Sequence, residues 1–135
     1  LIPGHNDSDA EIEAMTQWVV SHLGPEVPMH FTAFHPDWKM LEVSPTPATT
    51  LSRAREIARR NGVRYAYTGN VHDRRGESTW CHQCGNLLIE RDWYELGTWG
   101  LDAHGRCAVC GTPCAGVFEA RPGGWGSRRQ PVAMA

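Results

Sequence analysis

Two kinds of hydrophobic pattern alternate in the first half of the chain. After Ser8, apolar side chains recur every three or four residues, which predicts an amphipathic helix. Ser8 and Glu11 form an S-x-x-E capping pair at its start, and Gly24, followed by proline, ends it. The expected buried stripe consists of Ile12, Met15, Val19 and Leu23.

A second helical pattern occupies residues 46–60. Thr46 is its predicted N-terminal cap, with Thr49 and Thr50 as later alternatives, and Asn61-Gly62 ends it. The apolar stripe consists of Leu51, Ala54, Ile57 and Ala58. The arginines are expected on or near the solvent-facing side of this helix; they are Arg53, Arg55, Arg59 and Arg60.

Short apolar runs around these helices predict strands. Residues 29–34 and 63–68 have the length and the apolar and aromatic content of strands, and residues 1–4 resemble the end of a strand that begins earlier. The order strand, helix, strand, helix, strand is typical of parallel βαβ units. The first half therefore predicts an α/β fold, and we expect the chain to be the C-terminal part of a longer protein.

A polar group follows each of the three predicted strands, at residues 5–7, 35–37 and 70–73. The carboxyl ends of parallel strands meet at one edge of a sheet or barrel, where ligands bind, so we predict a ligand-binding edge. The candidate residues are His5, Asn6, Asp7, His35, Asn70 and His72. His22 and His30 are expected to be packing or surface residues.

The second half contains two C-x2-C pairs, each followed by glycine and separated by 22 residues. Four thiolates at this spacing predict a tetrahedral metal site, and zinc suits it best. Because protein would fill all four positions, the metal would be structural. The predicted ligands are Cys81, Cys84, Cys107 and Cys110.

Other interpretations of these cysteines are a rubredoxin-like iron site and plain thiols or disulfides. Cys114 is interpreted as a spare thiol, with replacement of one ligand as the alternative. His82 and His104 lie near the pairs in sequence and are expected in solvated loops.

The segment between the two cysteine pairs predicts a hairpin of residues 86–91 and 94–101 that turns at Asp92, with residues 116–120 as a third strand. The predicted division is a barrel segment at 1–76, a metal module at 77–120 and a Gly/Pro-rich tail at 121–135. Trp125 and Val132 suggest that the tail packs on another part of the protein.

Composition excludes some classes of function. With 13 basic and 15 acidic side chains the formal net charge is −2, which argues against nucleic-acid binding. The sequence contains no run of 18 apolar residues, so it predicts no membrane span. It also contains no charged segment followed by an apolar one of the kind found in signal peptides. Paired cysteines in such a chain favour the reducing cytoplasm.

Several motifs in order resemble the radical SAM enzyme of the AmmeMemoRadiSam system, a family related to the pyruvate formate-lyase activating enzymes. They are Ile-Pro-Gly-His-Asn-Asp at 2–7, His-Phe-Thr-Ala-Phe-His-Pro-Asp-Trp-Lys-Met at 30–40, Tyr-Thr-Gly-Asn-Val-His-Asp at 67–73, the two cysteine pairs, and Gly-Trp-Gly and Pro-Val in the tail. The resemblance covers nearly the whole chain.

This resemblance implies a partial (β/α) barrel that binds a [4Fe-4S] cluster and S-adenosylmethionine. Reductive cleavage of S-adenosylmethionine would release methionine and a 5′-deoxyadenosyl radical, which abstracts hydrogen from a substrate. His35 matches a histidine that contacts S-adenosylmethionine, whereas Asn6, Asp7, Asn70 and His72 match motifs without an assigned role. A protein substrate and the partner proteins of the system are the implied partners.

The chain departs from the family in one respect, because it lacks the C-x3-C-x2-C triplet that binds the cluster. We therefore expect this chain alone to bind no cluster and to be inactive. The alternatives are a zinc-ribbon module that binds a protein or nucleic acid without catalysis, and an iron electron-transfer protein.

Overall fold

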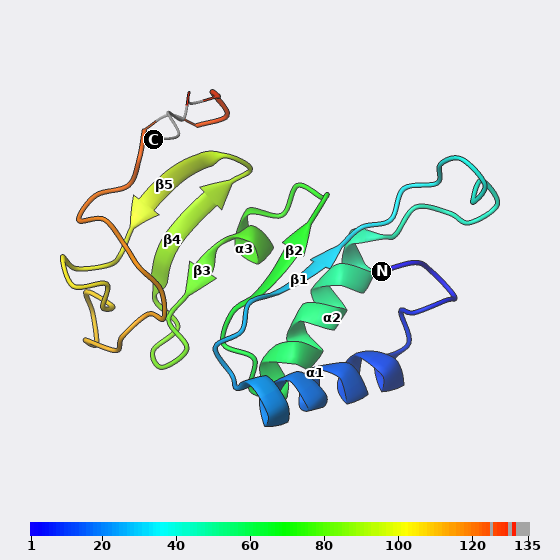
Figure 1. Ribbon diagram of the computed structural model, residues 1–135, viewed down its shortest axis with the longest axis horizontal. Helices are drawn as coiled ribbons and strands as arrows, with labels where there is room; N and C mark the ends of the chain where they lie inside the picture. Colours follow the sequence, from blue (N-terminus) through cyan, green and yellow to red (C-terminus); the bar gives the residue numbers. More distant parts are fainter. Residues whose placement is uncertain (125, 130, 132–135) are drawn as a thin grey trace. The chain divides into compact units, whose positions relative to one another are not determined.

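The computed structural model describes residues 1–124, 126–129 and 131 (Figure 1). The chain forms two units, Leu1–Glu77 and Ser78–Ala135, and each is considered by itself. Trp125 and Val132, which the sequence suggested as packing residues of the tail, lie outside the described residues. In the part of the chain that is described, no helix is long and apolar enough to span a bilayer.

The first unit is built on two parallel strands. β1 (Met29–Thr32) pairs with β2 (Ala66–Gly69) from Met29 opposite Ala66 to Thr32 opposite Gly69, and the two arrows point the same way in Figure 1. α2 (Ala48–Arg60) lies between them in the chain. The predicted parallel βαβ unit is confirmed, while two strands do not make a barrel, so the barrel stays a prediction.

The strand expected at residues 1–4 is not formed in the described structure. The side chain of Asn6 instead accepts a hydrogen bond from the Ile2 N–H at 2.6 Å, which bends this segment into a turn. The N-terminal ammonium of Leu1 still reaches the end of β1, where it donates to the Thr32 carbonyl at 2.7 Å. The prediction was wrong because side-chain hydrogen bonds compete with strand pairing here.

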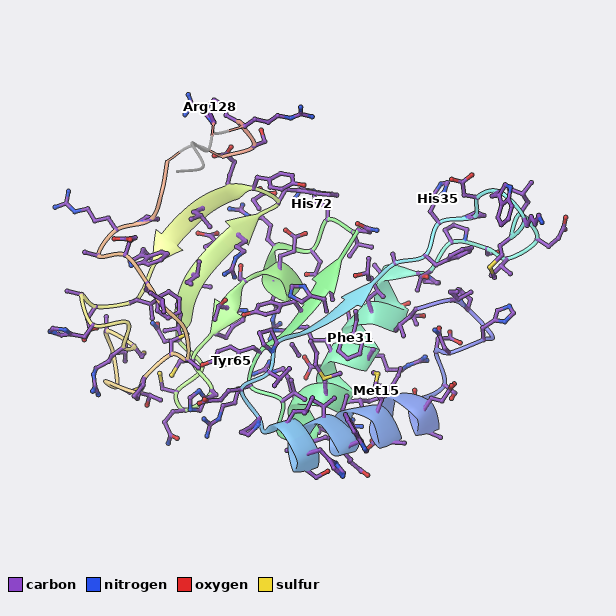
Figure 2. All side chains as sticks on the ribbon, in the orientation of Figure 1. Met15, Phe31, His35, Tyr65, His72 and Arg128 are labelled. Atoms are coloured by element: carbon purple, nitrogen blue, oxygen red, sulfur yellow. The ribbon has the colours of Figure 1, made fainter. Side chains whose placement is uncertain are left out.

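α1 (Asp9–Leu23) begins as predicted, since the Ser8 hydroxyl accepts a hydrogen bond from the Glu11 N–H at 3.3 Å. Its buried stripe differs, because Ile12 and Thr16 are buried while Met15 (Figure 2) and Leu23 are 41% and 57% exposed. Thr16 can enter the core because its hydroxyl donates to the Ile12 carbonyl at 2.7 Å, which satisfies the polar atom inside the helix.

α2 begins at Ala48 with Pro47 in the cap position, so Thr46 is not the cap. The buried Thr46 hydroxyl instead donates to the Leu1 carbonyl at 2.6 Å and accepts from the Phe34 N–H at 2.8 Å. It therefore ties the N-terminal segment to the chain that follows β1. A second correction concerns Arg55, which was expected near the solvent side and is only 5% exposed.

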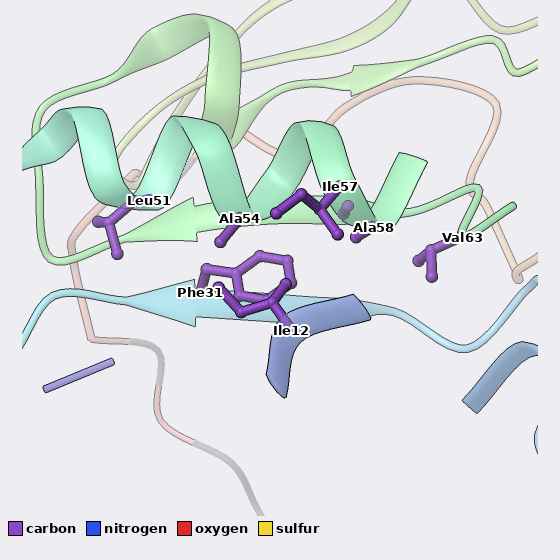
Figure 3. Packing of buried hydrophobic residues seen from close by; sticks show 8 residues of the cluster. Ile12, Phe31, Leu51, Ala54, Ile57, Ala58 and Val63 are labelled. Carbon is purple, nitrogen blue, oxygen red and sulfur yellow. The ribbon is translucent and has the colours of Figure 1, made fainter. Parts of the chain in front are cut away.

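The hydrophobic core of the first unit lies between the two helices and one face of the sheet. Figure 3 shows Phe31 of β1 against α2, with Ile12 of α1 beside it. The cluster consists of Ile12, Phe31, Leu51, Ala54, Ile57, Ala58, Val63 and Ala66. The predicted stripe of α2 is thus confirmed as core.

The opposite face of the sheet carries different side chains. The exposed His30 of β1 lies beside Tyr67 of β2, with the ring centroids 5.0 Å apart. Among the described residues of this unit, neither α1 nor α2 covers that face, because both contribute to the core on the Phe31 side. After β2, α3 (Arg74–Glu77) adds one helical turn.

The second unit is a three-stranded antiparallel sheet in the order β3-β4-β5. β4 (Leu87–Asp92) and β5 (Glu95–Trp99) form the predicted hairpin, which turns through Trp93 with a positive φ of 53°. The third strand is β3 (Thr79–Trp80), and residues 116–120 are not a strand, contrary to the prediction. The Phe118 ring instead packs edge-on against Trp99, with centroids 6.5 Å apart, so a ring contact anchors this segment.

Candidate metal centre and strand-end residues

The four cysteines predicted as ligands come together in the second unit. All four Sγ atoms lie within 4.8 Å of one another. Two short contacts join the two halves of the site, because Cys81 Sγ lies 3.6 Å from Cys110 Sγ and Cys84 Sγ lies 3.7 Å from Cys107 Sγ. Residues far apart in sequence therefore form one group of sulfurs.

The two C-x2-C turns have the same backbone geometry. In the first, Gly85 N–H donates to the Cys81 carbonyl at 2.9 Å and Cys81 N–H donates to the Asn86 carbonyl at 2.8 Å. In the second, the corresponding hydrogen bonds are Gly111 N–H to Cys107 carbonyl at 2.8 Å and Cys107 N–H to Thr112 carbonyl at 2.8 Å. Gly85 and Gly111 have φ values of 73° and 72°, a region that glycine enters without strain.

The halves also match in burial, since Cys81 and Cys107 are buried while Cys84 and Cys110 are exposed. Each buried sulfur is paired with an exposed sulfur from the other turn. One side of the group therefore faces the interior of the unit, and the other side is exposed to solvent.

The electrostatics of the group favour a bound cation. Hydrogen bonds from the Thr112 hydroxyl and N–H lower the pKa of Cys110 to about 6. For Cys84, the backbone of Asn86 pulls the pKa down, but the adjacent sulfurs, led by Cys110, outweigh it and raise the pKa to about 12. Four thiolates this close repel one another unless a cation neutralises them.

The sulfur group fits a tetrahedral metal ion. With Zn–S bonds of about 2.3 Å, the edges of a four-sulfur tetrahedron are about 3.8 Å long. The distances of 3.6 and 3.7 Å between opposing sulfurs are close to this value. The four cysteines could therefore hold a metal ion with little rearrangement, and they leave no position for a substrate.

The remaining candidates near this centre lie outside the sulfur group. Cys114 is 7% exposed, and its backbone N–H donates to the Gly105 carbonyl at 3.0 Å. Among the described residues the group of possible metal ligands contains the four cysteines and not Cys114. His82 and His104 are exposed.

The strand-end residues of the first unit lie near the carboxyl edge of the sheet. Figure 2 shows His35 in the loop after β1 and His72 in the loop after β2, and both are exposed. The Asn70 side chain donates to the Ala33 carbonyl at 3.5 Å, a long hydrogen bond that joins the segments after the two strands. Asn70 has a positive φ of 56°, which an asparagine tolerates in a turn.

The N-terminal candidates have local structural contacts. The Asp7 carboxylate accepts from the Gly4 N–H at 2.8 Å, and Asn6 caps the turn described above. His5 is exposed. Among the described residues, histidines and carboxylates at this edge form no group that could hold a metal. The structure thus brings the segments to one edge without bringing their side chains into one cluster.

One group that the sequence analysis missed surrounds Asp73. The Thr68 hydroxyl donates to the Asp73 carboxylate at 3.1 Å, and the Gly76 N–H donates to its other oxygen at 3.0 Å. Asp73 thereby caps α3, and the D-x-x-G spacing was the signal available in the sequence. Arg55 lies near this group, and no local pattern distinguishes it from the exposed arginines of α2.

Together the fold and the site define a mixed α/β protein with a four-cysteine centre that could bind a metal. A Methanocaldococcus jannaschii protein described only as "Uncharacterized protein MJ0808" is 42% identical over 112 residues, which cover 82% of this chain and 34% of that protein. The chain thus spans about a third of the length of this relative. No family model matches the chain, and no solved structure matches it.

Proposed function

We propose that this chain is the C-terminal portion of a radical SAM enzyme similar to that of the AmmeMemoRadiSam system, followed by a structural zinc ribbon. The observation that carries the proposal is the parallel β1–α2–β2 unit, in which motifs of that family follow each strand at the carboxyl edge. This edge is where α/β folds bind ligands.

The packing of both helices on one face of the sheet supports the same proposal. Parallel sheets are almost always covered on both faces, whereas within this unit both helices pack on the Phe31 side. In a partial barrel, the face that carries His30 and Tyr67 would be the interior. The exposed His30 of this face would then line a cavity formed with strands outside this chain.

The residues divide into distinct roles under this proposal. His35 would contact S-adenosylmethionine, and the loops that hold His5, Asn70 and His72 would border the same site. The four cysteines would bind zinc and hold the ribbon together without taking part in the reaction. A cytoplasmic location, where thiols stay reduced, suits this centre.

The cysteines of this chain do not fit the catalytic cluster of that family. Four of the five belong to the sulfur group, and the spacing C-x3-C-x2-C does not occur. The ligands of a [4Fe-4S] cluster would therefore come from residues outside this chain. The chemistry of the whole enzyme, its substrate and its partner proteins remain part of the proposal.

The test uses the coding region extended upstream of the codon for Leu1. We expect an in-frame C-x3-C-x2-C triplet there, and we expect the extended protein, reconstituted with iron and sulfide and then reduced, to convert S-adenosylmethionine to methionine and 5′-deoxyadenosine. His35→Ala should slow this conversion at least about tenfold, because one positioned contact to the cofactor is lost. His22→Ala, an exposed histidine on α1, is the matched control. Absence of the triplet, or equal rates for both variants, would contradict the proposal.

A second candidate is a docking module without catalysis. It is favoured by the aromatic tip of the β4–β5 hairpin, where Trp93 and Tyr94 are 54% and 69% exposed. Exposed aromatic residues are enriched at protein interfaces. The 5′-deoxyadenosine assay separates the two candidates, since a docking module produces none.

A further inference from the structure

A cavity of about 380 Å³ lies in the first unit and contains none of the cysteines of the sulfur group. One wall comes from α2 and the other from the segment that contains α3. Its lining is polar and consists of Ser52, Arg55, Glu56, Asp73, Arg75 and Gly76. The volume is within the range of small-ligand sites, which is about 300–1,000 Å³.

Arg55 is the most buried charged group of this cavity, with a side chain that is 6% exposed. Its Nε atom donates to the Ala66 carbonyl at 2.9 Å, which fixes the plane of the guanidinium against β2. Its Nη1 atom makes a long hydrogen bond of 3.4 Å to Glu56, and Nη2 has no hydrogen-bond partner among the described residues. The guanidinium of Arg55 is therefore hydrogen-bonded along one edge, and the Nη2 N–H donors on its other edge have no acceptor among the described residues.

Charged groups of both signs surround Arg55. The groups that act on Arg55 electrostatically include the cations Arg59 and Arg75 and the anions Glu56 and Asp73. Both oxygens of Asp73 already accept hydrogen bonds, from Thr68 and Gly76. Glu56 is 58% exposed and also pairs with Arg59 at 3.9 Å. Asp73 is thus held by other donors, and Glu56, which contacts Arg55 at 3.4 Å, shares its carboxylate with Arg59.

The wall opposite Arg55 is rigidly packed. Any side chain at Gly76 would collide with Thr68 and Asp73. The Asp73 N–H also donates to the Glu77 carboxylate at 3.2 Å, which closes the turn around this wall. Because this wall is already ordered, the cavity is formed before a ligand binds. Binding then costs less conformational entropy.

We propose that this cavity binds the oxyanion of a small molecule, with Arg55 as the buried cation and Arg75 as the second cation at its border. Guanidinium groups match the geometry of phosphate and carboxylate oxygens, because their N–H donors form a planar fork. The site is independent of the proposed enzymatic activity and of the metal centre. It would be occupied by a phosphorylated or carboxylated small ligand.

The test is a titration of the 135-residue chain with inorganic phosphate at constant ionic strength, with chloride as the replaced anion. We expect saturable changes in the NMR signals of Arg55 Nε–H and the Gly76 amide. Arg75→Gln should weaken phosphate binding about tenfold, since one charge-assisted contact is lost. Arg74→Gln is the matched control because Arg74 is the exposed neighbour that does not line the cavity.

Acetate, titrated in the same way, distinguishes the two ligand chemistries. Stronger saturation by acetate than by phosphate supports a carboxylate site, and the reverse order supports a phosphate site. Signals that do not saturate with either anion would overturn the proposal, and so would equal weakening by Arg74→Gln and Arg75→Gln. The dispersed amide spectrum of each variant checks that it remains folded.

Discussion

In the first unit, eight buried apolar side chains from helices, strands and their connections pack into one core, whereas the buried apolar side chains among the described residues of the second unit are Leu88, Ile89, Leu101 and three cysteines. The first unit can therefore be stabilised by removing apolar surface from water. The second has much less of that surface, and modules of this kind obtain their folding free energy from the bound metal. The same kind of substitution should therefore have different consequences in the two units.

The largest effect is expected from loss of one sulfur. Cys107→Ser should release the metal and unfold the second unit, because the apparent binding free energy of structural zinc is about 10–16 kcal/mol. The amide signals of the first unit should remain dispersed, since its core does not depend on the metal. Elemental analysis of the purified protein and an NMR spectrum measure the two effects.

Cys114→Ser is the matched control for this change, because Cys114 is equally a buried cysteine of the second unit but lies outside the sulfur group. It should retain one equivalent of metal. A second unit that stays folded in Cys107→Ser after the metal is lost would contradict the comparison, because it would mean that the unit is held together by packing. Zinc with no visible absorption is expected, and a coloured protein would indicate iron at the four cysteines.

A substitution in the core of the first unit should have a smaller effect on stability, and the second unit should keep its metal. Leu51 is fully buried, so Leu51→Ala should lower the free energy of unfolding by about 2–5 kcal/mol through lost burial and a residual cavity. Urea unfolding followed by signals of the first unit measures this change. The metal content should not alter.

Leu23→Ala sharpens this test, because the same side chain is deleted from a helix position that is 57% exposed. The hydrophobic pattern predicts a core residue at this position, whereas the structure predicts a change of less than about 0.5 kcal/mol. Equal destabilisation by the two variants would show that the end of α1 is buried after all.

The features that the sequence predicted correctly are those that depend on neighbours in the chain. The two C-x2-C-G turns depend on hydrogen bonds within six residues, as in the Gly85 to Cys81 contact. The Ser8 cap of α1 and the stripe of α2 follow in the same way from local spacing. Local rules therefore place each half of the metal centre, although the approach of the halves needs the intervening hairpin.

The features that the sequence did not reveal depend on partners distant in the chain. Thr16 replaces Met15 in the core because Asn61, 45 residues away, donates to its hydroxyl at 2.8 Å. Arg55 is buried because the Ala66 carbonyl accepts its Nε–H, and Thr46 is drawn away from the helix by Leu1. Each of these polar residues looks solvent-facing in sequence, and tertiary hydrogen bonds overrule the pattern.

The smallest effect concerns a polar contact between the helices of the first unit. The Glu13 carboxylate on α1 accepts hydrogen bonds from Asn61 at 2.9 Å and Arg60 at 3.1 Å, and these contacts, with Asn61 first, lower its pKa below the ordinary 4.5. A carboxyl group with a lowered pKa in the folded state contributes stability above pH 4.5 that is lost as the pH falls through the lowered value.

Glu13→Gln should therefore destabilise the first unit slightly at neutral pH and have less effect at about pH 3, as urea unfolding at the two pH values would show. The change is small because the contact is partly exposed and screened by solvent. Glu119→Gln in the second unit is the control, and a difference between wild type and Glu13→Gln that stays constant with pH would show that this contact does not join the two helices.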